Sequence, residues 1–249
     1  NRWNEFMYLR SRLTAFLHEQ NIRAFRFFLI NQTDTHRFNR GALLNVGFLA
    51  AQSYGCDYLA LQDVDLIPVH HNISYRFPSP GVYHASSRDV HPRYRYKAFF
   101  GGVLLLQTQS YALLGGFENG FWGYGGEDDE FFRRTMIVRN KYKASGNFSV
   151  TRPEVAESKE ERSRIQYWEH NHPQSVKRDK DKQFMHRERV KSRGPHALKF
   201  ECEKVYSADA VTSNDTIVLD VQLHCDYEQS PQCSTDWLQS IQTQAANQH

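Results

Sequence analysis

Long hydrophobic runs, cysteine and net charge are all scarce in this sequence. No apolar run among its 249 residues is long enough to cross a membrane. The formal net charge of +3 is too small to predict a nucleic-acid partner, although it suits a small anionic ligand. Four cysteines are few, whereas 40% hydrophobic residues at this length provide ample core for one large domain or two small ones.

A signal peptide is also missing from the start of the sequence. The chain begins at Asn1-Arg2-Trp3, already in a helical pattern, so we expect a piece of a longer protein, and the lack of an anchor here does not show that the longer protein lacks one. Cys225 and Cys233 flank a Ser-Pro turn, a spacing that suits a local disulfide. Four N-x-S/T sequons weakly favour a secretory compartment, and they begin at Asn31, Asn72, Asn147 and Asn214.

Hydrophobic periodicity predicts alternating helices and strands. We expect an amphipathic helix over 3–20, a strand over 24–30, a helix capped by Asn39 that ends near Ser53, and a strand over 58–62. This order predicts an α/β fold with a mostly parallel central sheet flanked by helices. Further elements are expected at 99–107, 110–114, 127–139, 147–153, 200–208 and 216–223, whereas 72–97 should be irregular, 154–195 a charged mobile surface segment and 236–249 a frayed tail.

Two acids, Asp63 and Asp65, directly follow the predicted strand over 58–62. Ligands bind beyond the carboxyl ends of strands in α/β sheets, and two carboxylates one residue apart can reach a divalent cation that carries a nucleotide. Asp-x-Asp is a common spacing that usually marks a solvated loop, so its position after an apolar strand is what favours a site.

His170-Asn171-His172 is a second candidate for metal binding. Two imidazoles one residue apart can ligate one ion, and mixed carboxylate and imidazole ligation suits Mn²⁺. Exposed histidines in a charged loop are the alternative, and we assign the neighbouring pair His70-His71 to the surface. At the start of the second helix, Arg40 could hold a phosphate and Phe38 could pack against a base.

The stretch Phe121–Phe131 carries aromatic rings, three glycines and four consecutive acids. Rings cover a sugar face, carboxylates grip hydroxyl groups or abstract a proton, and glycines let the backbone approach a ligand closely. The alternative is an ordinary loop whose acids favour the N-terminus of the following helix.

Together these stretches resemble the β-1,4-galactosyltransferase family. The matching residues are 37–48, 63–68, 100–103 and 121–131, and their order and spacing agree from the first helix to about Cys233. The resemblance implies a GT-A-type nucleotide-sugar transferase fold. It also implies a single catalytic galactosyltransferase domain over 1–235, truncated at its N-terminus.

Within this family the sequence is most similar to the xylosylprotein branch. Residues 91–97 resemble its tyrosine-bearing loop, Glu127–Phe131 ends as that branch does, and both the His-x-His pair and the cysteine pair are similar. The branch transfers galactose from UDP-galactose to the 4-hydroxyl of xylose on proteoglycan core proteins, in glycosaminoglycan linker synthesis. It implies a xylosylated core protein as partner, no nucleic acid, and the Golgi lumen as location, in a type II membrane protein.

Site residues follow from the resemblance, position by position. Asp128 would be the general base of an inverting transfer. Mn²⁺ would be bound by Asp65, His170 and His172. UDP and the donor sugar would contact Arg2, Phe38, Arg40, Asp63, Val64, Gly102 and Glu127. The acceptor would contact Tyr94, Tyr96, Trp122, Tyr124 and Asp129.

Two departures from the family pattern keep alternatives open. Most of the opening Pro-Phe-Arg-x-Arg uridine motif is missing, apart from Asn1-Arg2, and Tyr124 replaces a family tryptophan that stacks at the sugar site. The acceptor could instead be N-acetylglucosamine or glucose. A sugar-binding relative without turnover and a metal-dependent phosphoesterase are the alternatives from other functional classes.

Overall fold

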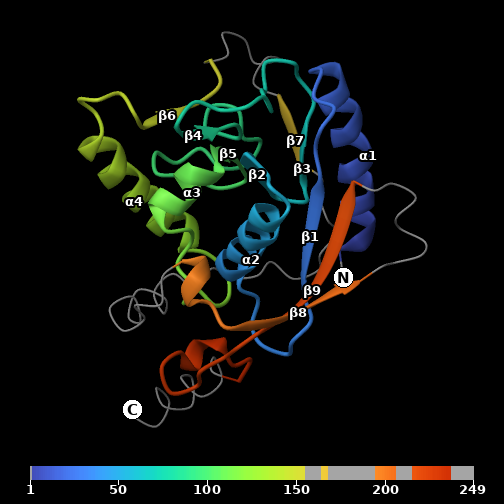
Figure 1. Ribbon diagram of the computed structural model, residues 1–249, viewed down its shortest axis with the longest axis vertical. Coiled ribbons are helices and arrows are strands. Elements are labelled where there is room, and N and C mark those ends of the chain that lie inside the picture. Colours follow the sequence, from blue (N-terminus) through green and yellow to red (C-terminus); the bar gives the residue numbers. More distant parts are fainter. Residues whose placement is uncertain (1, 155–163, 168–193, 206–214, 237–249) are drawn as a thin grey trace. The chain divides into compact units, whose positions relative to one another are not determined.

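The computed structural model of the chain describes residues 2–154, 164–167, 194–205 and 215–236 (Figure 1). The chain forms two compact units. Unit 1 comprises Asn1–Phe27, Ala50–Gly115 and Asp128–Pro173, and unit 2 comprises Phe28–Leu49, Gly116–Glu127 and Gln174–His249. His170 and His172, most of the predicted mobile segment and most of the predicted tail lie outside the described residues.

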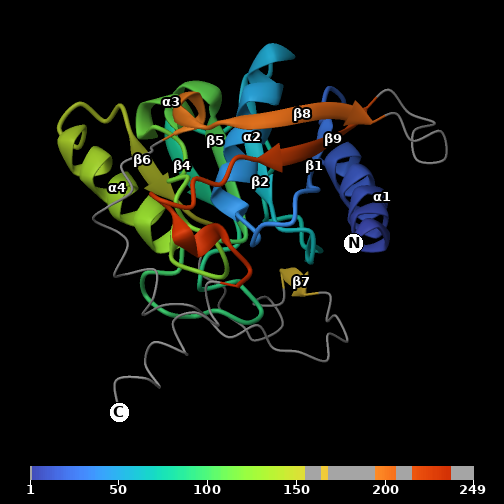
Figure 2. The same ribbon diagram turned by 90° about the horizontal axis from the view of Figure 1, so that it is seen from below.

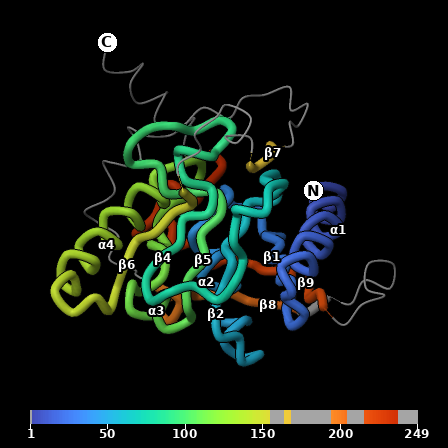
Figure 3. Tube along the Cα trace, turned by 90° about the horizontal axis from the view of Figure 1, so that it is seen from above, coloured from blue at the N-terminus to red at the C-terminus, as the bar shows by residue number. Residues whose placement is uncertain are grey.

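Unit 1 contains a four-stranded sheet in the order β2-β5-β4-β6, which can be followed along the tube in Figure 3. Its strands are β2 (Tyr58–Gln62), β5 (Val103–Gln107), β4 (Gly81–His84) and β6 (Ser149–Thr151). β5 is antiparallel to both β2 and β4, whereas β4 and β6 are parallel. All four side chains of Val103–Leu106 are buried, so β5 is the apolar centre of this sheet.

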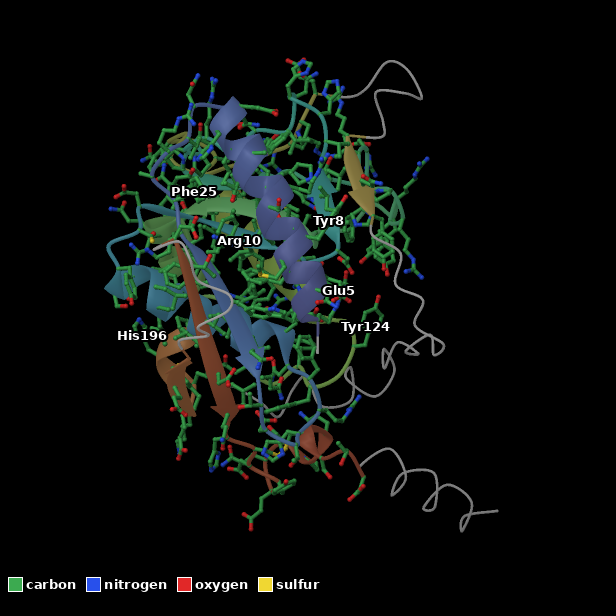
Figure 4. The ribbon with its side chains drawn as sticks, turned by 90° about the vertical axis from the view of Figure 1, so that its right-hand side faces the viewer. Glu5, Tyr8, Arg10, Phe25, Tyr124 and His196 are labelled. Carbon is green, nitrogen blue, oxygen red and sulfur yellow. A yellow bond between two sulfur atoms is a disulfide. The ribbon has the colours of Figure 1, made fainter. Side chains whose placement is uncertain are left out.

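Helix α1 (Trp3–Glu19) packs beside β3 (Leu66–Pro68), which is paired with β7 (Ile165–Tyr167) in a second, antiparallel sheet of unit 1 (Figure 1). The buried side chains of α1 recur at helical spacing and comprise Phe6, Leu9, Leu13, Phe16 and Leu17. Figure 4 shows Tyr8 and Arg10 on opposite sides of α1. Four of the buried side chains of α1 form one core with Leu66, Ile67 and Ile165, namely Leu9, Leu13, Phe16 and Leu17.

Helices α3 (Thr108–Leu114) and α4 (Glu127–Lys141) complete unit 1, except that Glu127 itself falls in unit 2. Glu130 and Arg134 form a buried ion pair on α4, with Arg134 Nε donating to both carboxylate oxygens at 2.8 Å. Arg134 Nη1 also donates to the carbonyl of Leu114 at the end of α3. The bond to Leu114 ties α4 to α3, and α4 is the helix that carries the predicted general base, Asp128.

Unit 2 contains a three-stranded sheet in the order β1-β9-β8, formed by β1 (Phe27–Gln32), β9 (Thr216–Leu223) and β8 (Phe200–Val205). Figure 2 shows β8 and β9 side by side, and their pairing is antiparallel. Helix α2 (Arg40–Ser53) begins in this unit, where Asn39 Oδ1 accepts a hydrogen bond of 3.0 Å from the Ala42 N–H. Asn39 therefore caps α2, as the sequence predicts.

The α/β class of the fold is confirmed, but the prediction of a mostly parallel sheet is wrong. That prediction assumed that consecutive strands around α2 would be parallel neighbours. Instead β1 belongs to the sheet of β9, whereas β2 pairs with β5. A long connection separates β2 from β5, which leaves the pair free to run antiparallel. Two regions expected from the sequence to lack strands each contain one. β4 lies within 72–97, and β7 lies within 154–195.

The structure joins Cys225 to Cys233 by a disulfide, with their Cα atoms 5.9 Å apart. The carbonyl of Cys233 accepts a bond of 2.9 Å from the Arg37 N–H, and Arg37 Nη1 donates to the Gln232 carbonyl at 3.0 Å. The disulfide loop therefore holds the chain just before Phe38 and Arg40. No helix in the described residues is long and apolar enough to span a bilayer.

Candidate active site

The first turn of α4 places Asp128 against the backbone at Gly101. A Cβ atom at Gly101 would collide with Oδ2 of Asp128, so glycine is what lets the carboxylate approach the chain. Gly102 has a φ of +79°, and a Cβ there would lie 2.6 Å from Leu66 Cδ1. Unit 1 thus brings the predicted general base beside the predicted donor-binding glycine.

Hydrogen bonds from three groups hold the two glycines. His84 Nε2 lies 3.0 Å from the Gly101 carbonyl and must carry the proton, since a carbonyl only accepts. Ser86 Oγ donates to the same carbonyl at 2.8 Å, and the Asp63 N–H donates to the Gly102 carbonyl at 3.0 Å. The last bond connects Asp63, the predicted nucleotide-binding acid, to Gly102, which directly follows the glycine that Asp128 approaches.

Asp63, Val64 and Asp65 form the short connection between β2 and β3. The Leu66 N–H donates to the Asp63 carbonyl at 3.2 Å, which closes the turn. Asp65 Oδ2 lies 3.3 Å from Arg2 Nη2. The prediction that this Asp-x-Asp follows directly on the strand over 58–62 is therefore confirmed.

The Asp65 carboxylate fits a cation site, because it attracts a positively charged partner in the structure, the Arg2 guanidinium. β3 begins at Leu66 and is paired with β7, with Leu66 opposite Tyr167. The strand that leads toward His170 and His172 thus runs beside the strand that follows Asp65. One carboxylate with two imidazoles is a ligand set that Mn²⁺ accepts. Within the described ranges, no group of three or more metal-ligating side chains gathers.

The predicted acceptor tyrosines share one aromatic neighbour. The ring of Phe99 lies 5.4 Å from that of Tyr94 and 5.6 Å from that of Tyr96, between ring centroids. Tyr96 is exposed, whereas Phe99 is buried. Such a ring platform suits the apolar face of a sugar.

In unit 2, buried asparagines attach the segment 116–127 to α2. Asn45 accepts a bond of 2.9 Å from the Phe117 N–H, and it donates both to the Phe117 carbonyl and to Asn119 Oδ1. Asn39 Nδ2 donates to the Asn119 carbonyl at 2.7 Å. The chain is therefore fixed at Phe117 and Asn119, just before the glycine-rich stretch Phe121–Phe131.

The predicted donor residues of unit 2 come together at the start of α2. Arg40 Nη1 lies 3.8 Å from Glu127 Oε1, and the Phe38 carbonyl accepts a bond of 2.7 Å from the Gly123 N–H. Trp122 is buried, with its ring 5.9 Å from that of His36. Phe38 and Tyr124 are both exposed, and Tyr124 is labelled in Figure 4.

Three residues that contact the predicted site were not found from the sequence, namely His84, Ser86 and Gly101. His84 and Ser86 lie in a region read as irregular, where no periodicity marks β4. Gly101 lies in the matching stretch 100–103, but the sequence assigned it no role of its own. Its role depends on the approach of Asp128, which a local pattern does not contain.

Gly101→Ala should reduce transfer strongly while leaving the fold intact. The added methyl group would displace the Asp128 carboxylate, and a misplaced base costs on the order of tenfold to a hundredfold in kcat. Steady-state kinetics and thermal unfolding would separate the two effects. Gly55→Ala is the control for loss of a glycine, because a Cβ there meets nothing within 4 Å, although its φ of +71° adds local strain. Normal kcat in Gly101→Ala would contradict the tight seat for Asp128.

Acid should destabilise the fold through two buried histidines. Burial lowers the pKa of His84 to about 3 and that of His91 to about 4. Below the unfolded pKa of about 6.5 the unfolded chain therefore binds more protons than the folded chain, so stability falls as pH falls. Each histidine should cost about 2 kcal/mol between pH 7 and pH 5. Denaturant unfolding at both pH values measures this, and equal stability would contradict it.

Comparison with known proteins places this arrangement in context. A family model described as the N-terminal region of glycosyl transferase group 7 matches residues 1–78, and one described as the N-terminal domain of galactosyltransferase matches residues 81–166. The chain is 35% identical over 240 residues to a Caenorhabditis elegans protein named xylosylprotein 4-beta-galactosyltransferase, covering 94% of this chain and 79% of that protein. It is 46% identical over 133 residues to human beta-1,4-galactosyltransferase 7, covering 53% of this chain and 40% of the relative.

A solved structure is similar over nearly the whole chain. It is the crystal structure of a mutant of Drosophila beta-1,4-galactosyltransferase 7 in complex with manganese, UDP-Gal and xylobiose, with a TM-score of 0.75 and 31% sequence identity. The match covers 94% of this chain and 95% of that one. This identity and coverage extend well beyond a shared fold. The chain therefore belongs to the β-1,4-galactosyltransferase family, in its xylosylprotein branch.

Proposed function

We propose that this chain transfers galactose from UDP-galactose to the 4-hydroxyl of xylose on proteoglycan core proteins, with Mn²⁺ as cofactor. The observation that carries the proposal is the close approach of the Asp128 carboxylate to Gly101, with the Asp63 N–H bonded to the carbonyl of the next residue, Gly102. We assign the catalytic domain to 1–235, since predicted site residues occur in both units. The Golgi lumen is the proposed location, with the anchor of a type II membrane protein outside this chain.

Asp128 acts as the general base in the proposed reaction. Its carboxylate takes the proton of the acceptor 4-hydroxyl as that oxygen attacks the anomeric carbon of galactose. Attack from the face opposite UDP converts an α-linked donor into a β-linked product in one inverting step. Gly101 leaves room for the carboxylate, and its backbone position is fixed by the bonds of His84 and Ser86 to the Gly101 carbonyl.

Binding of the donor is assigned to Arg2, Phe38, Arg40, Asp63, Val64, Gly102 and Glu127. Arg40 carries a charge that suits the diphosphate, and the exposed Phe38 ring suits the uracil face. Bound Mn²⁺, held by Asp65, His170 and His172, would stabilise negative charge on the departing UDP as a Lewis acid. Binding of the acceptor is assigned to Tyr94, Tyr96, Trp122, Tyr124 and Asp129.

An acceptor panel tests the function directly. The chain would be given UDP-galactose and Mn²⁺ with a β-xyloside, an N-acetylglucosaminide or glucose, each with and without a chelator. Chelator-sensitive product on the xyloside alone is the expected result. Product on the glucosaminide instead would favour N-acetylglucosamine as the acceptor. This is the second candidate because an exposed Tyr124 replaces the family tryptophan at the sugar site.

Loss of one predicted metal ligand should change the metal titration. His172→Ala should raise the Mn²⁺ concentration needed for half-maximal activity by on the order of tenfold or more, since even outer-sphere partners of metal ligands have effects of this size. His71→Ala, at an exposed histidine, is the matched control. If the two variants need the same Mn²⁺ concentration, His172 is not a metal ligand and the alternative of an exposed histidine in a charged loop is favoured.

A further inference from the structure

We propose that His91 is the positioning residue of the acceptor loop, which we define as residues 91–97 and which contains Tyr94 and Tyr96. Through its ring nitrogen Nδ1, His91 holds the loop backbone in the shape that presents the two tyrosines. This inference rests on the proposed function, because the acceptor loop matters only if the chain binds an acceptor sugar there.

The imidazole of His91 is a hydrogen-bond acceptor for two successive backbone groups. Its Nδ1 accepts a bond of 3.0 Å from the Arg93 N–H and one of 2.8 Å from the Tyr94 N–H. The ring is 3% exposed, and the His91 N–H donates to the Ser87 carbonyl at 2.8 Å. A buried side chain therefore fastens the loop to the chain that follows β4.

The His91 ring also packs against the aromatic side chains of this region. Its centroid lies 5.1 Å from that of Tyr94 and 4.7 Å from that of Phe99. Phe99 in turn contacts Tyr94 and Tyr96. His91 thus fixes both the backbone of the loop and the aromatic platform on which its two tyrosines rest.

The side chains of the acceptor loop are mostly exposed, so its bonds to His91 matter for its conformation. Pro92, Arg93, Arg95, Tyr96 and Lys97 are all exposed, so burial of side chains gives the loop little order. Arg93 Nη1 donates to the Tyr167 hydroxyl at 3.3 Å, but that bond is exposed and should contribute weakly. The two bonds to a buried nitrogen are the stronger restraint.

The anchorage requires a neutral ring. Two N–H groups point at Nδ1, so the proton must be on Nε2, and protonation of Nδ1 would place a donor against two donors. Burial is the largest influence and lowers the pKa of His91 to about 4, Asp63 raises it, and Arg93 lowers it further. His84 on β4 is buried and neutral as well, so it adds no positive charge nearby at neutral pH.

Two substitutions separate the acceptor nitrogen from the ring. In His91→Asn, the new Oδ1 is two bonds from Cβ, as Nδ1 is, so it can accept the same two N–H bonds while the ring is lost. In His91→Phe, the ring remains and the acceptor is lost. His70→Phe is the matched control, because His70 Nδ1 accepts one bond of 3.2 Å from the Asn72 N–H in a different loop.

Two readouts apply to each variant of the full chain. We expect His91→Phe to lose hydrogen-exchange protection at the Arg93 and Tyr94 amides, and to raise KM for a β-xyloside by on the order of tenfold with KM for UDP-galactose unchanged. His91→Asn should retain amide protection and most of the acceptor affinity. His70→Phe should leave both readouts as in the wild type.

Protected amides together with a normal acceptor KM in His91→Phe would overturn the proposal. Equal losses of amide protection and acceptor affinity in His91→Asn and His91→Phe would also overturn it, because they would indicate that His91 acts through ring packing alone. If His91→Phe does not fold, the protection of the two amides at pH 7 and pH 4, corrected for intrinsic exchange, decides instead. Protection should fall with pH in the wild type and not in His91→Asn, and parallel behaviour would refute the proposal. Wild-type transfer to the xyloside tests the function separately, because amide protection does not depend on turnover.

Discussion

Asp128→Asn should abolish most galactose transfer while UDP still binds. Asparagine keeps the shape of the side chain against Gly101 but cannot take a proton, and loss of a general base lowers kcat by roughly 10² to 10⁴. Single-turnover kinetics with a β-xyloside would measure the chemical step, and calorimetric titration with UDP and Mn²⁺ would measure donor binding.

The control for this change is Asp57→Asn, which removes one exposed carboxylate from unit 1 away from the predicted site residues. It should leave both measurements unchanged. Near-normal turnover in Asp128→Asn would remove Asp128 from the mechanism. Loss of UDP binding together with transfer would instead indicate that Asp128 organises the donor site.

Glu130→Ala should destabilise the protein by about 3–5 kcal/mol. The change leaves the Arg134 guanidinium buried without its carboxylate, whereas the pair is at present bidentate and further bonded to the Leu114 carbonyl. Denaturant-induced unfolding gives the free energy, and the midpoint should shift with little change in slope.

Arg133 provides a matched comparison on the same helix. Its Nη2 also contacts Glu130 Oε1, at 3.2 Å, but half of its side chain is exposed, so Arg133→Gln should cost less than about 1 kcal/mol. Replacing both Glu130 and Arg134 by methionine should recover most of the stability lost in Glu130→Ala. A small effect of Glu130→Ala would mean that the pair does not anchor α4.

Local patterns in the sequence predict several elements at their observed positions. Asn39 caps α2 because its short side chain reaches the Ala42 N–H, an interaction contained within four residues. β2 ends at Gln62 and the acids follow at once, as the apolar run Tyr58–Leu61 indicates. Recognition of the family comes from the order of such motifs, each of which is weak alone.

Pairings between distant segments explain what the sequence does not predict. β7 has three residues, and its identity as a strand depends on β3, about a hundred positions earlier. The direction of β5 relative to β2 is likewise set by its neighbours and not by its own Val-Leu-Leu-Leu pattern. The contribution of Ser86 and His84 to the site becomes visible only when Gly101 lies next to them.

The interleaving of the two units has a consequence for synthesis on the ribosome. β1, at residues 27–32, is translated well before its sheet partner β9, at residues 216–223. β3 likewise waits for β7 at residues 165–167. The edge of β3 therefore stays unpaired until β7 is translated and that of β1 until β9 is translated, and such edges are prone to mispairing. We expect termination between residues 174 and 215 to leave β1 without its partner β9, so that unit 2 cannot form and the exposed edge of β1 promotes aggregation.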